Sequence, residues 1–448
     1  MNPSLIQRII EQINQSPSPF HAVQTMISAL KRKGFSELKE TDSWQVSSAG
    51  RYFVVRDYTA LIAFIIPENG LGKPPPLRLA GAHTDSPTLK VKPTPLKIKK
   101  NQWVWDIEVY GSPILSTWFD RDLSLAGLIG YRDPSGRVGH QLIDFQQPLA
   151  RIPNLAIHLN PDTNNGFTPN RHTELNPILA STKTKGYPDD ARELLIYLLQ
   201  NKPLNPPDVL SNQGTVLDWD LSFYDSQPVQ FSGLDSQWVV GARLDNLLSC
   251  FTGLEALCDV TADQNLPMLA CFDHEEVGSN ATTGANGNFI ESLLRRLIPD
   301  QESFCQTMAN GRMISVDNAH GEHANFPNRQ DENNMPLLGE GVVLKYNANQ
   351  RYATQARSGS WFRALCQDYQ IPTQHFTVRA DSSCGSTIGP LLSARLGLST
   401  LDIGIPTWAM HSIRETACSQ DISSLHQLWR GFYNSPPTTE SSLKTVMK

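Results

Sequence analysis

An apolar run that ends in a dense group of acidic side chains constrains this chain more than any other feature. Leu266–Phe272 (LPMLACF) is short and apolar, and Gln264 and Asn265 precede it, which is typical of a buried central strand. Residues 273–276 then place three carboxylates and one imidazole in four consecutive positions. Carboxylates this close repel one another unless a cation or a proton lies between them. Because open α/β sheets bind ligands at the carboxyl ends of their strands, the pattern favours a metal site over a solvated turn.

Four further apolar segments lead into residues of the same types. Residues 77–80 precede GAHTDSP, in which His83 and Asp85 are two positions apart and so project to the same side of an extended chain. Taken alone, each of these residues is also compatible with a structural role. An aspartate at the start of a helix, for example, is often an N-cap. The other candidates are Asp245 after residues 238–241, Asp317 and His320 after 312–316, and His411 after 401–405.

The residue types in this set indicate the kind of metal. No cysteine belongs to it, which excludes a cysteine-rich structural zinc site. Histidine and carboxylate ligands suit a catalytic zinc ion, with manganese or cobalt as alternatives. Five metal-binding side chains, one of them bridging, suit a pair of ions about 3.5–4 Å apart. Of the two neighbouring glutamates, one would bind metal while the other stays free to move a proton.

The chain of 448 residues is too long for one simple core. Its pattern of residue types changes near residue 90 and again near residue 232. Residues 90–232 show repeated prolines, alternating apolar residues and many turn signals. We therefore predict an α/β domain formed by residues 1–89 and 233–434, a β-rich domain inserted at 90–232, and a disordered tail at 435–448. Trp103, Trp105 and Trp118 are expected in the core of the inserted domain. The apolar LAIHL segment predicts a strand that carries His158, which taken alone is typical of a core histidine.

Charge and cysteine content narrow the classes of function. The balance of 38 basic to 44 acidic residues gives a net charge of −6, with scattered basic residues, which argues against nucleic acid as a partner. The seven cysteines include no C-x-x-C pair and favour a reducing compartment. No stretch approaches the about 18 apolar residues of a membrane span, and the N-terminus lacks the apolar core of a signal peptide. We expect a soluble, cytoplasmic protein.

Several long motifs, in this order and spacing, resemble the aspartyl aminopeptidase family of metallopeptidases. They are GAHTDSP, ARLDN, HEEVG, SVDNAH, NQRYAT, CGSTIGP and AMHSIRE, and the N-terminal SPSPFHA matches as well, so the resemblance covers nearly the whole chain. It implies a phosphorylase/hydrolase-like α/β/α metallopeptidase domain with an inserted β-rich dimerisation domain. It also implies dimers that assemble into a tetrahedral dodecamer, and removal of N-terminal Asp and Glu from small peptides.

The resemblance assigns roles through these motifs. His83 and Asp317 would bind one zinc ion and Glu276 and His411 the other, with Asp245 bridging the two and joined to Asn246 by a cis peptide bond. A water between two such ions ionises near neutral pH and can attack the first peptide carbonyl. Further roles would fall to Glu275 as general base, Asp85 in orienting His83, His320 in stabilising the oxyanion, Lys345 in binding the substrate carboxylate, and His158 in the active site of a neighbouring subunit.

Three alternatives stay open on the sequence. Lys345 by itself is more typical of a surface lysine on a strand. A similar metal site also serves aminopeptidases for neutral residues, carboxypeptidases and deacylases, and a large peptidase-like assembly can be mainly structural. The stretch 160–177 departs from the animal members of the family in its flanks, which affects the expected interface and substrate loop but not the metal ligands.

Overall fold

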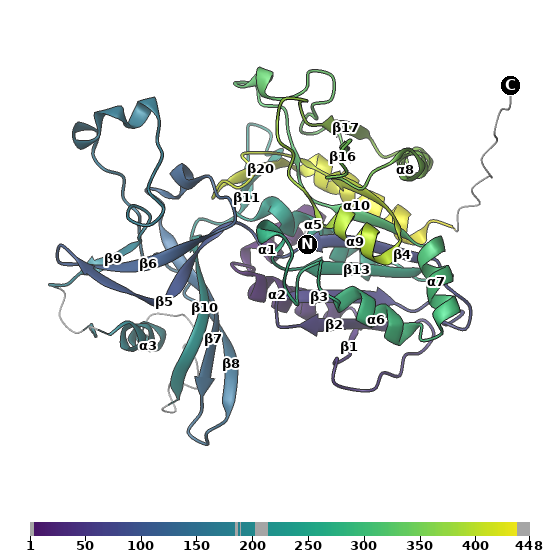
Figure 1. Cartoon of the computed structure of the whole chain (residues 1–448), viewed down its shortest axis with the longest axis horizontal. Helices are drawn as coiled ribbons and strands as arrows, with labels where there is room; N and C mark the ends of the chain where they lie inside the picture. The colour runs from purple at the N-terminus through teal and green to yellow at the C-terminus, as the bar shows by residue number, and fades with distance from the viewer. Residues whose placement is uncertain (1–3, 184–186, 189, 202–213, 437–448) are drawn as a thin grey trace.

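The computed structural model describes residues 4–183, 187–188, 190–201 and 214–436. Residues 437–448, which form most of the tail predicted at 435–448, lie outside this range. The chain forms two lobes of unequal size (Figure 1). A nine-stranded sheet lies in the larger lobe, a six-stranded sheet in the smaller one, and a five-stranded sheet at the side of the larger lobe that faces the smaller (Figure 1).

The nine-stranded sheet combines a parallel centre with antiparallel neighbours. Strand β4 pairs in parallel with β13 and β14, and β14 pairs in parallel with β18. Every residue of β4, β13 and β14 is buried, as expected for strands covered on both faces. The strands in spatial order are β1 (Ser36–Glu37), β2 (Arg51–Arg56), β3 (Ala60–Ile65), β13 (Leu266–Phe272), β4 (Leu77–His83), β14 (Arg312–Val316), β18 (Ser399–Gly404), β16 (Val342–Tyr346) and β17 (Thr373–Thr377).

Helices cover both faces of this sheet and complete an α/β/α sandwich. Side chains of β13 alternate between the two cores, with Leu269 and Cys271 in one and Met268 and Ala270 in the other. The predicted α/β class is therefore confirmed. The first core also holds α1 (Leu5–Asn14), α2 (Pro19–Arg32), α5 (Leu244–Cys258), α8 (Ala356–Asp368) and α10 (Ser419–Asn434), and the second holds α6 (Phe289–Leu297), α7 (Gln301–Asn310) and α9 (Ile388–Leu396).

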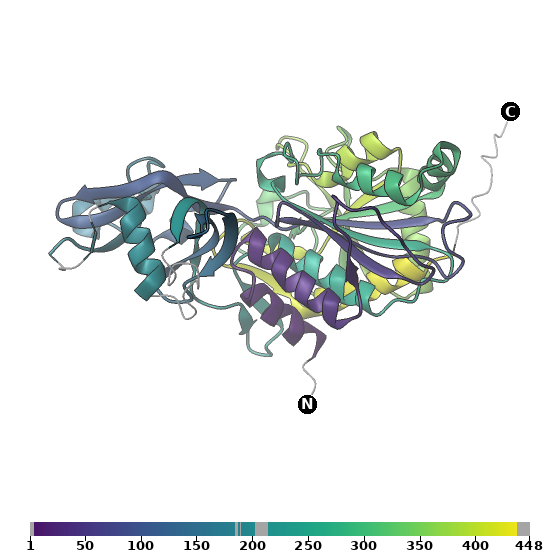
Figure 2. The ribbon, with the colours of Figure 1, turned by 90° about the horizontal axis from the view of Figure 1, so that it is seen from below.

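The N-terminal helices α1 and α2 each bury apolar side chains against the large sheet. Ser4 caps α1 by accepting a hydrogen bond from the Gln7 backbone N–H, and Pro19 begins α2, where its missing N–H costs nothing. Ile9, Ile10 and Ile13 are buried on one face of α1. Seen from below, both helices lie on the larger lobe beside the smaller one (Figure 2).

The smaller lobe is a fully antiparallel sheet with its own core. Trp105 and Trp118 belong to that core and Trp103 is also buried, as predicted. Helix α3 (Ala191–Asn201) adds Leu194, Leu195 and Leu198 to the core. The strands in spatial order are β8 (Val138–Asp144), β7 (Leu123–Arg132), β10 (Thr215–Asp225), β5 (Thr88–Lys99), β6 (Gln102–Tyr110) and β9 (Ile178–Ser181).

The prediction of a strand around His158 is wrong. Ile157–Leu159 forms a short 3-10 helix without a buried residue. Leu155, Ile157 and Leu159 are 57%, 45% and 72% exposed, so the apolar side chains that suggested a strand have no core to enter within this chain. His158 is exposed with them.

The five-stranded sheet positions the loops that follow the central strands. Its strand β15 (Ala319–His320) continues from the end of β14, and the loop between β19 (Pro406–Trp408) and β20 (Glu415–Cys418) carries His411. The remaining strands are β11 (Gln230–Ser232) and β12 (Trp238–Gly241), which leads into Asp245. Among the described residues, no helix is long and apolar enough to cross a lipid bilayer.

Candidate metal centre

The carboxyl ends of three parallel strands bring the predicted ligands to one edge of the large sheet. His83 is the last residue of β4 and pairs in register with Phe272, the last residue of β13. The acidic run 273–276 therefore begins beside His83. Asp317 directly follows β14, whose Ser315 pairs with Gly81 of β4. Parallel pairing thus places His83, Glu276 and Asp317 together, as the sequence predicts.

Two groups of three potential ligands share one residue. His83, Asp245 and Asp317 form one group, and Asp245, Glu276 and His411 form the other, with the ligand atoms of each group within 4.8 Å of one another. In the first group, His83 Nε2 lies 3.5 Å from Asp245 Oδ1 and 3.6 Å from Asp317 Oδ1. In the second, His411 Nε2 lies 3.3 Å from Glu276 Oε2 and 3.8 Å from Asp245 Oδ2. The two oxygens of Asp245 therefore face different groups.

Backbone carbonyls orient both histidines for metal binding. His83 Nδ1 lies 3.1 Å from the Asp85 carbonyl oxygen, and His411 Nδ1 lies 3.0 Å from the Ser112 carbonyl oxygen. A carbonyl can only accept a hydrogen bond, so Nδ1 carries the proton in each ring. The lone pair of a neutral imidazole is then on Nε2, the atom that faces the carboxylates.

The buried carboxylate of Asp85 supports the same site from behind. It accepts hydrogen bonds from the backbone N–H groups of Glu275 and Glu276, each at 3.1 Å. One of its oxygens also lies 3.4 Å from His83 Nδ1, slightly farther than its own carbonyl oxygen. Asp85 thus contacts His83 as predicted, and it also fixes the turn that carries the two glutamates.

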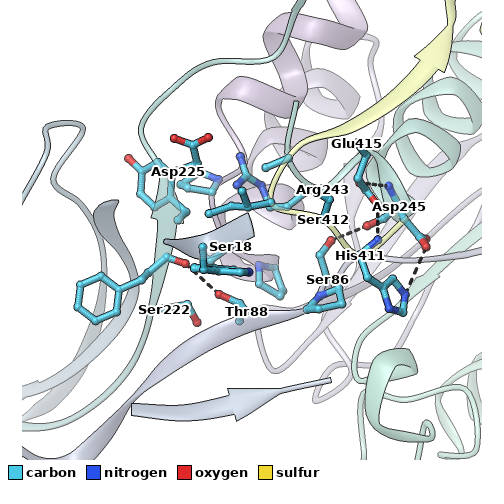
Figure 3. A pocket seen from close by; sticks show the side chains of 18 of the residues that line it. Ser18, Ser86, Thr88, Ser222, Asp225, Arg243, Asp245, His411, Ser412 and Glu415 are labelled. Atoms are coloured by element: carbon cyan, nitrogen blue, oxygen red, sulfur yellow. Dashed lines mark hydrogen bonds and ion pairs between the residues drawn. The ribbon is translucent and has the colours of Figure 1, made fainter. Parts of the chain in front are cut away.

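Glu415 is a site residue that the sequence reasoning did not single out. It is 2% exposed and accepts hydrogen bonds from the backbone N–H groups of Asp245 at 3.0 Å and His411 at 2.9 Å. Ser86 donates to the Asp245 carbonyl oxygen, and Figure 3 shows these residues side by side. The peptide bond between Asp245 and Asn246 is cis, as expected. The only sequence signal for Glu415 was its place in the AMHSIRE motif.

The charge of this cluster fits a cation. Burial, together with the charges of neighbouring aspartates, raises the pKa of Glu275 to about 8. Burial and the charge of Asp245 raise the pKa of Glu276 well above its ordinary value, and burial and Asp317 raise that of Asp245. Asp245 Oδ1 and Glu276 Oε1 are buried without a hydrogen-bond partner. Such oxygens are costly to bury alone, and divalent ions would satisfy them.

A cavity of about 500 Å³ opens onto the cluster and contains most of the other predicted residues. Lys345 lines it from β16, 2% exposed, with Nζ 3.5 Å from Asp317 Oδ2. Burial opposes ionisation of Asp317, but Lys345 and His83 outweigh it and hold the pKa of Asp317 below its ordinary range. His320 stands between this cavity and a neighbouring one of about 360 Å³. Glu275 and a second cation, Arg351, also line the cavity.

The structure thus gathers every predicted site residue except His158, which lies in the smaller lobe. Comparisons with known proteins identify the family of the chain. Residues 12–433 match the family model described as aminopeptidase I zinc metalloprotease (M18). A protein of Stutzerimonas stutzeri called "Probable M18 family aminopeptidase 2" is 47% identical over 436 residues, which cover 97% of this chain and 99% of that protein.

Solved structures show the same fold. A chain in the cryo-EM structure of the Ape4 and Nbr1 complex is 34% identical with a TM-score of 0.91, covering 96% of this chain and 85% of that one. The mApe1 dodecamer of S. cerevisiae is 25% identical with a TM-score of 0.81, covering 96% of this chain and 97% of that one. With a family model that spans nearly its whole length, this chain belongs to the M18 family of zinc metalloproteases and is a metalloaminopeptidase.

Proposed function

We propose that this aminopeptidase removes N-terminal Asp and Glu from peptides with two divalent ions bound, zinc in the first place and manganese or cobalt as alternatives. The single observation that supports the acidic preference is the buried ammonium group of Lys345 in the cavity beside the metal ligands. Arg351 adds a second positive side chain to the same lining. A carboxylate that enters this cavity would meet the positive charges of Lys345 and Arg351 beside the metal ligands.

The chain's own residues would divide the reaction between them. His83, Asp245 and Asp317 would hold one ion, and Asp245, Glu276 and His411 the other. Such a pair lowers the pKa of a bound water to about 7 and polarises the substrate carbonyl. Glu275 would take a proton from the attacking water and return it to the leaving amine, because its carboxylate lines the cavity without belonging to either ligand group. His320 would donate to the oxyanion from the edge of the cavity.

A panel of matched aminoacyl substrates tests the acidic preference. We expect the purified protein to prefer Asp and Glu over Leu and Ala. Lys345→Met should lower kcat/KM on Asp and Glu by about 10- to 100-fold, the size of a lost charge-assisted hydrogen bond, while kcat/KM on Leu and Ala stays close to the wild-type value. The measurement is kcat/KM for all four substrates with both proteins.

The contact between Lys345 and Asp317 supplies the competing explanation. If Lys345 only fixes this metal ligand, Lys345→Met lowers activity on all four substrates equally, and the specificity role is lost. Arg351→Met is the matched control. Arg351 is also a cation that lines the cavity, but within the part of the chain that the structure describes it forms no ion pair with a metal ligand. Wild-type preference for Leu or Ala would move the protein to the neutral-residue alternative. No turnover of any of the four substrates with any metal would contradict the proposed activity.

We further propose that the protein works as a homo-oligomer in which His158 enters a neighbouring active site, as dimers of a dodecamer. Three exposed apolar residues, Leu155, Ile157 and Leu159, flank His158 in the sequence on the smaller lobe. Exposed apolar groups of this kind mark contact surfaces. The mApe1 structure of S. cerevisiae is a dodecamer, which supports assembly of a related chain.

Mixing two weakly active variants tests the role of His158. His158→Ala and Glu275→Gln subunits are each expected to be weakly active alone. If His158 acts across a dimer interface, a mixed dimer contains one active site with both residues. Co-assembly at equal amounts should then restore roughly a quarter of wild-type activity, because half of the dimers are mixed and each has one intact site. Activity no greater than the mean of the two parent variants would contradict the role, and full activity in His158→Ala alone would do so as well.

A further inference from the structure

The end of strand β6 reaches from the smaller lobe to the candidate metal centre. β6 ends at Tyr110, and Gly111 and Ser112 follow it. We call these three residues the β6-end segment. Each contacts a different part of the site, although none supplies a ligand. Through them the smaller lobe contacts the second group of metal-binding residues directly and the first group by way of Asp85.

Tyr110 contacts Asp85, which in turn contacts His83 of the first group. Its hydroxyl donates a hydrogen bond of 2.7 Å to Asp85 Oδ2, the oxygen that also accepts the Glu276 N–H. Burial and the charge of Asp85 raise the pKa of Tyr110 far above its ordinary value, so the phenol keeps its proton and remains a donor. The ring is held by an edge contact with His274 at 6.2 Å and by the Lys90 ammonium group 5.3 Å from its centroid. Tyr110 therefore has one well-defined position.

Gly111 and Ser112 contact the second group. Gly111 has a φ of +71°, and a Cβ atom there would lie 3.2 Å from Glu276 Cβ, so a larger residue would be strained and would press on this ligand. The Ser112 carbonyl oxygen accepts from His411 Nδ1 at 3.0 Å. The backbone N–H of Ile114 also donates to the His411 carbonyl oxygen at 2.9 Å. The chain after β6 thus fixes both the ring and the backbone of His411.

We infer that the β6-end segment is a positioning element through which the smaller lobe sets the geometry of both metal-binding groups. Tyr110 acts through Asp85 on His83 and on the turn that carries Glu275 and Glu276. Ser112 acts on the tautomer of His411. The inference rests on the proposed metal-binding roles of these residues. It gives the smaller lobe a part in metal binding within its own chain, separate from any part in assembly.

Removing the Tyr110 hydroxyl tests this positioning role. Tyr110→Phe keeps the ring but leaves Asp85 without its donor from the smaller lobe. Loss of a group that orients metal ligands typically lowers metal affinity or activity 10- to 100-fold. We expect Zn²⁺ titrated into chelator-treated full-length Tyr110→Phe to bind about 10- to 100-fold more weakly than to wild type. In the zinc-loaded variant, kcat should fall while KM changes little.

Tyr224→Phe is the matched control. Tyr224 also lies in the smaller lobe, and its hydroxyl donates to a carboxylate at 2.6 Å, but the acceptor is Asp144, which is not part of the site. Both variants should lose similar thermal stability in chelator, and only Tyr110→Phe should lose zinc affinity. Gly111→Ala is the second test, and its affinity should also fall.

The outcomes separate the inference from the proposed function. Wild-type zinc affinity in both Tyr110→Phe and Gly111→Ala would overturn the positioning role, and so would equal losses in Tyr110→Phe and Tyr224→Phe. Zinc affinity that falls only in the β6-end variants would support it, even if the wild-type enzyme proved to prefer neutral substrates. A wild-type protein that binds no zinc at all would overturn the proposed metal centre and this inference together.

Discussion

Replacing Glu275 by glutamine is expected to lower kcat by about 10²- to 10⁴-fold while the protein keeps its metal ions, because general acid–base catalysis contributes a factor of this size. Glutamine has nearly the same shape and cannot accept the proton of an attacking water. Glu275 lines the site cavity but belongs to neither group of potential ligands. The measurement is kcat on an N-terminal Asp substrate together with metal content by elemental analysis.

The neighbouring residue supplies the control for this prediction. Glu276→Gln changes the same functional group one position along the same turn, but Glu276 Oε2 faces His411 Nε2 at 3.3 Å and belongs to a ligand group. It should therefore lose bound metal as well as activity. If Glu275→Gln loses metal as readily as Glu276→Gln, Glu275 is a ligand and the proposed division of roles is wrong. If Glu275→Gln keeps wild-type kcat, another group serves as the base.

The sequence predicts the part of this site that depends on strand ends. His83, Glu276 and Asp317 follow buried apolar strands, and parallel pairing brings such ends to one edge regardless of other details. Asp245, at the start of α5, and His411, in the loop after β19, lie next to strands of the five-stranded sheet. They too are recognisable, because each is a ligand-type residue a few positions after an apolar run. Local patterns are sufficient where the relevant geometry is that of a strand terminus.

Residues whose role depends on packing between distant segments were not predictable in this way. Lys345 is typical of a surface position by sequence, and it is buried because the cavity beside Asp317 takes its ammonium group. Tyr110 and Ser112 act through the way the smaller lobe sits on the larger one, which no local pattern encodes. The error at His158 has the opposite cause. The apolar LAIHL segment predicted a strand, but the chain itself offers those side chains no core.

Asp245→Ala is expected to remove both metal ions, whereas His83→Ala and His411→Ala should each lose mainly one. The reason is that the two oxygens of Asp245 face different groups, toward His83 Nε2 and His411 Nε2. Elemental analysis gives the number of ions that each variant binds, before and after treatment with a chelator. Activity in zinc-saturated buffer is measured alongside. If Asp245→Ala keeps one firmly bound ion, Asp245 is not shared between the two groups.

Thermal stability distinguishes a metal ligand from a structural aspartate at position 245. Ligands that bind only the folded state raise the melting temperature, so wild type should melt at a higher temperature with zinc than with a chelator, and Asp245→Ala should lose most of that difference. In chelator, however, burial and Asp317 raise the pKa of Asp245, which means that its charge is unfavourable there without a cation. Asp245→Ala should therefore melt no lower than wild type in chelator. A large loss of stability under that condition would instead mean that Asp245 also holds the fold together without metal, and an undiminished zinc-dependent difference would contradict its assignment as a ligand.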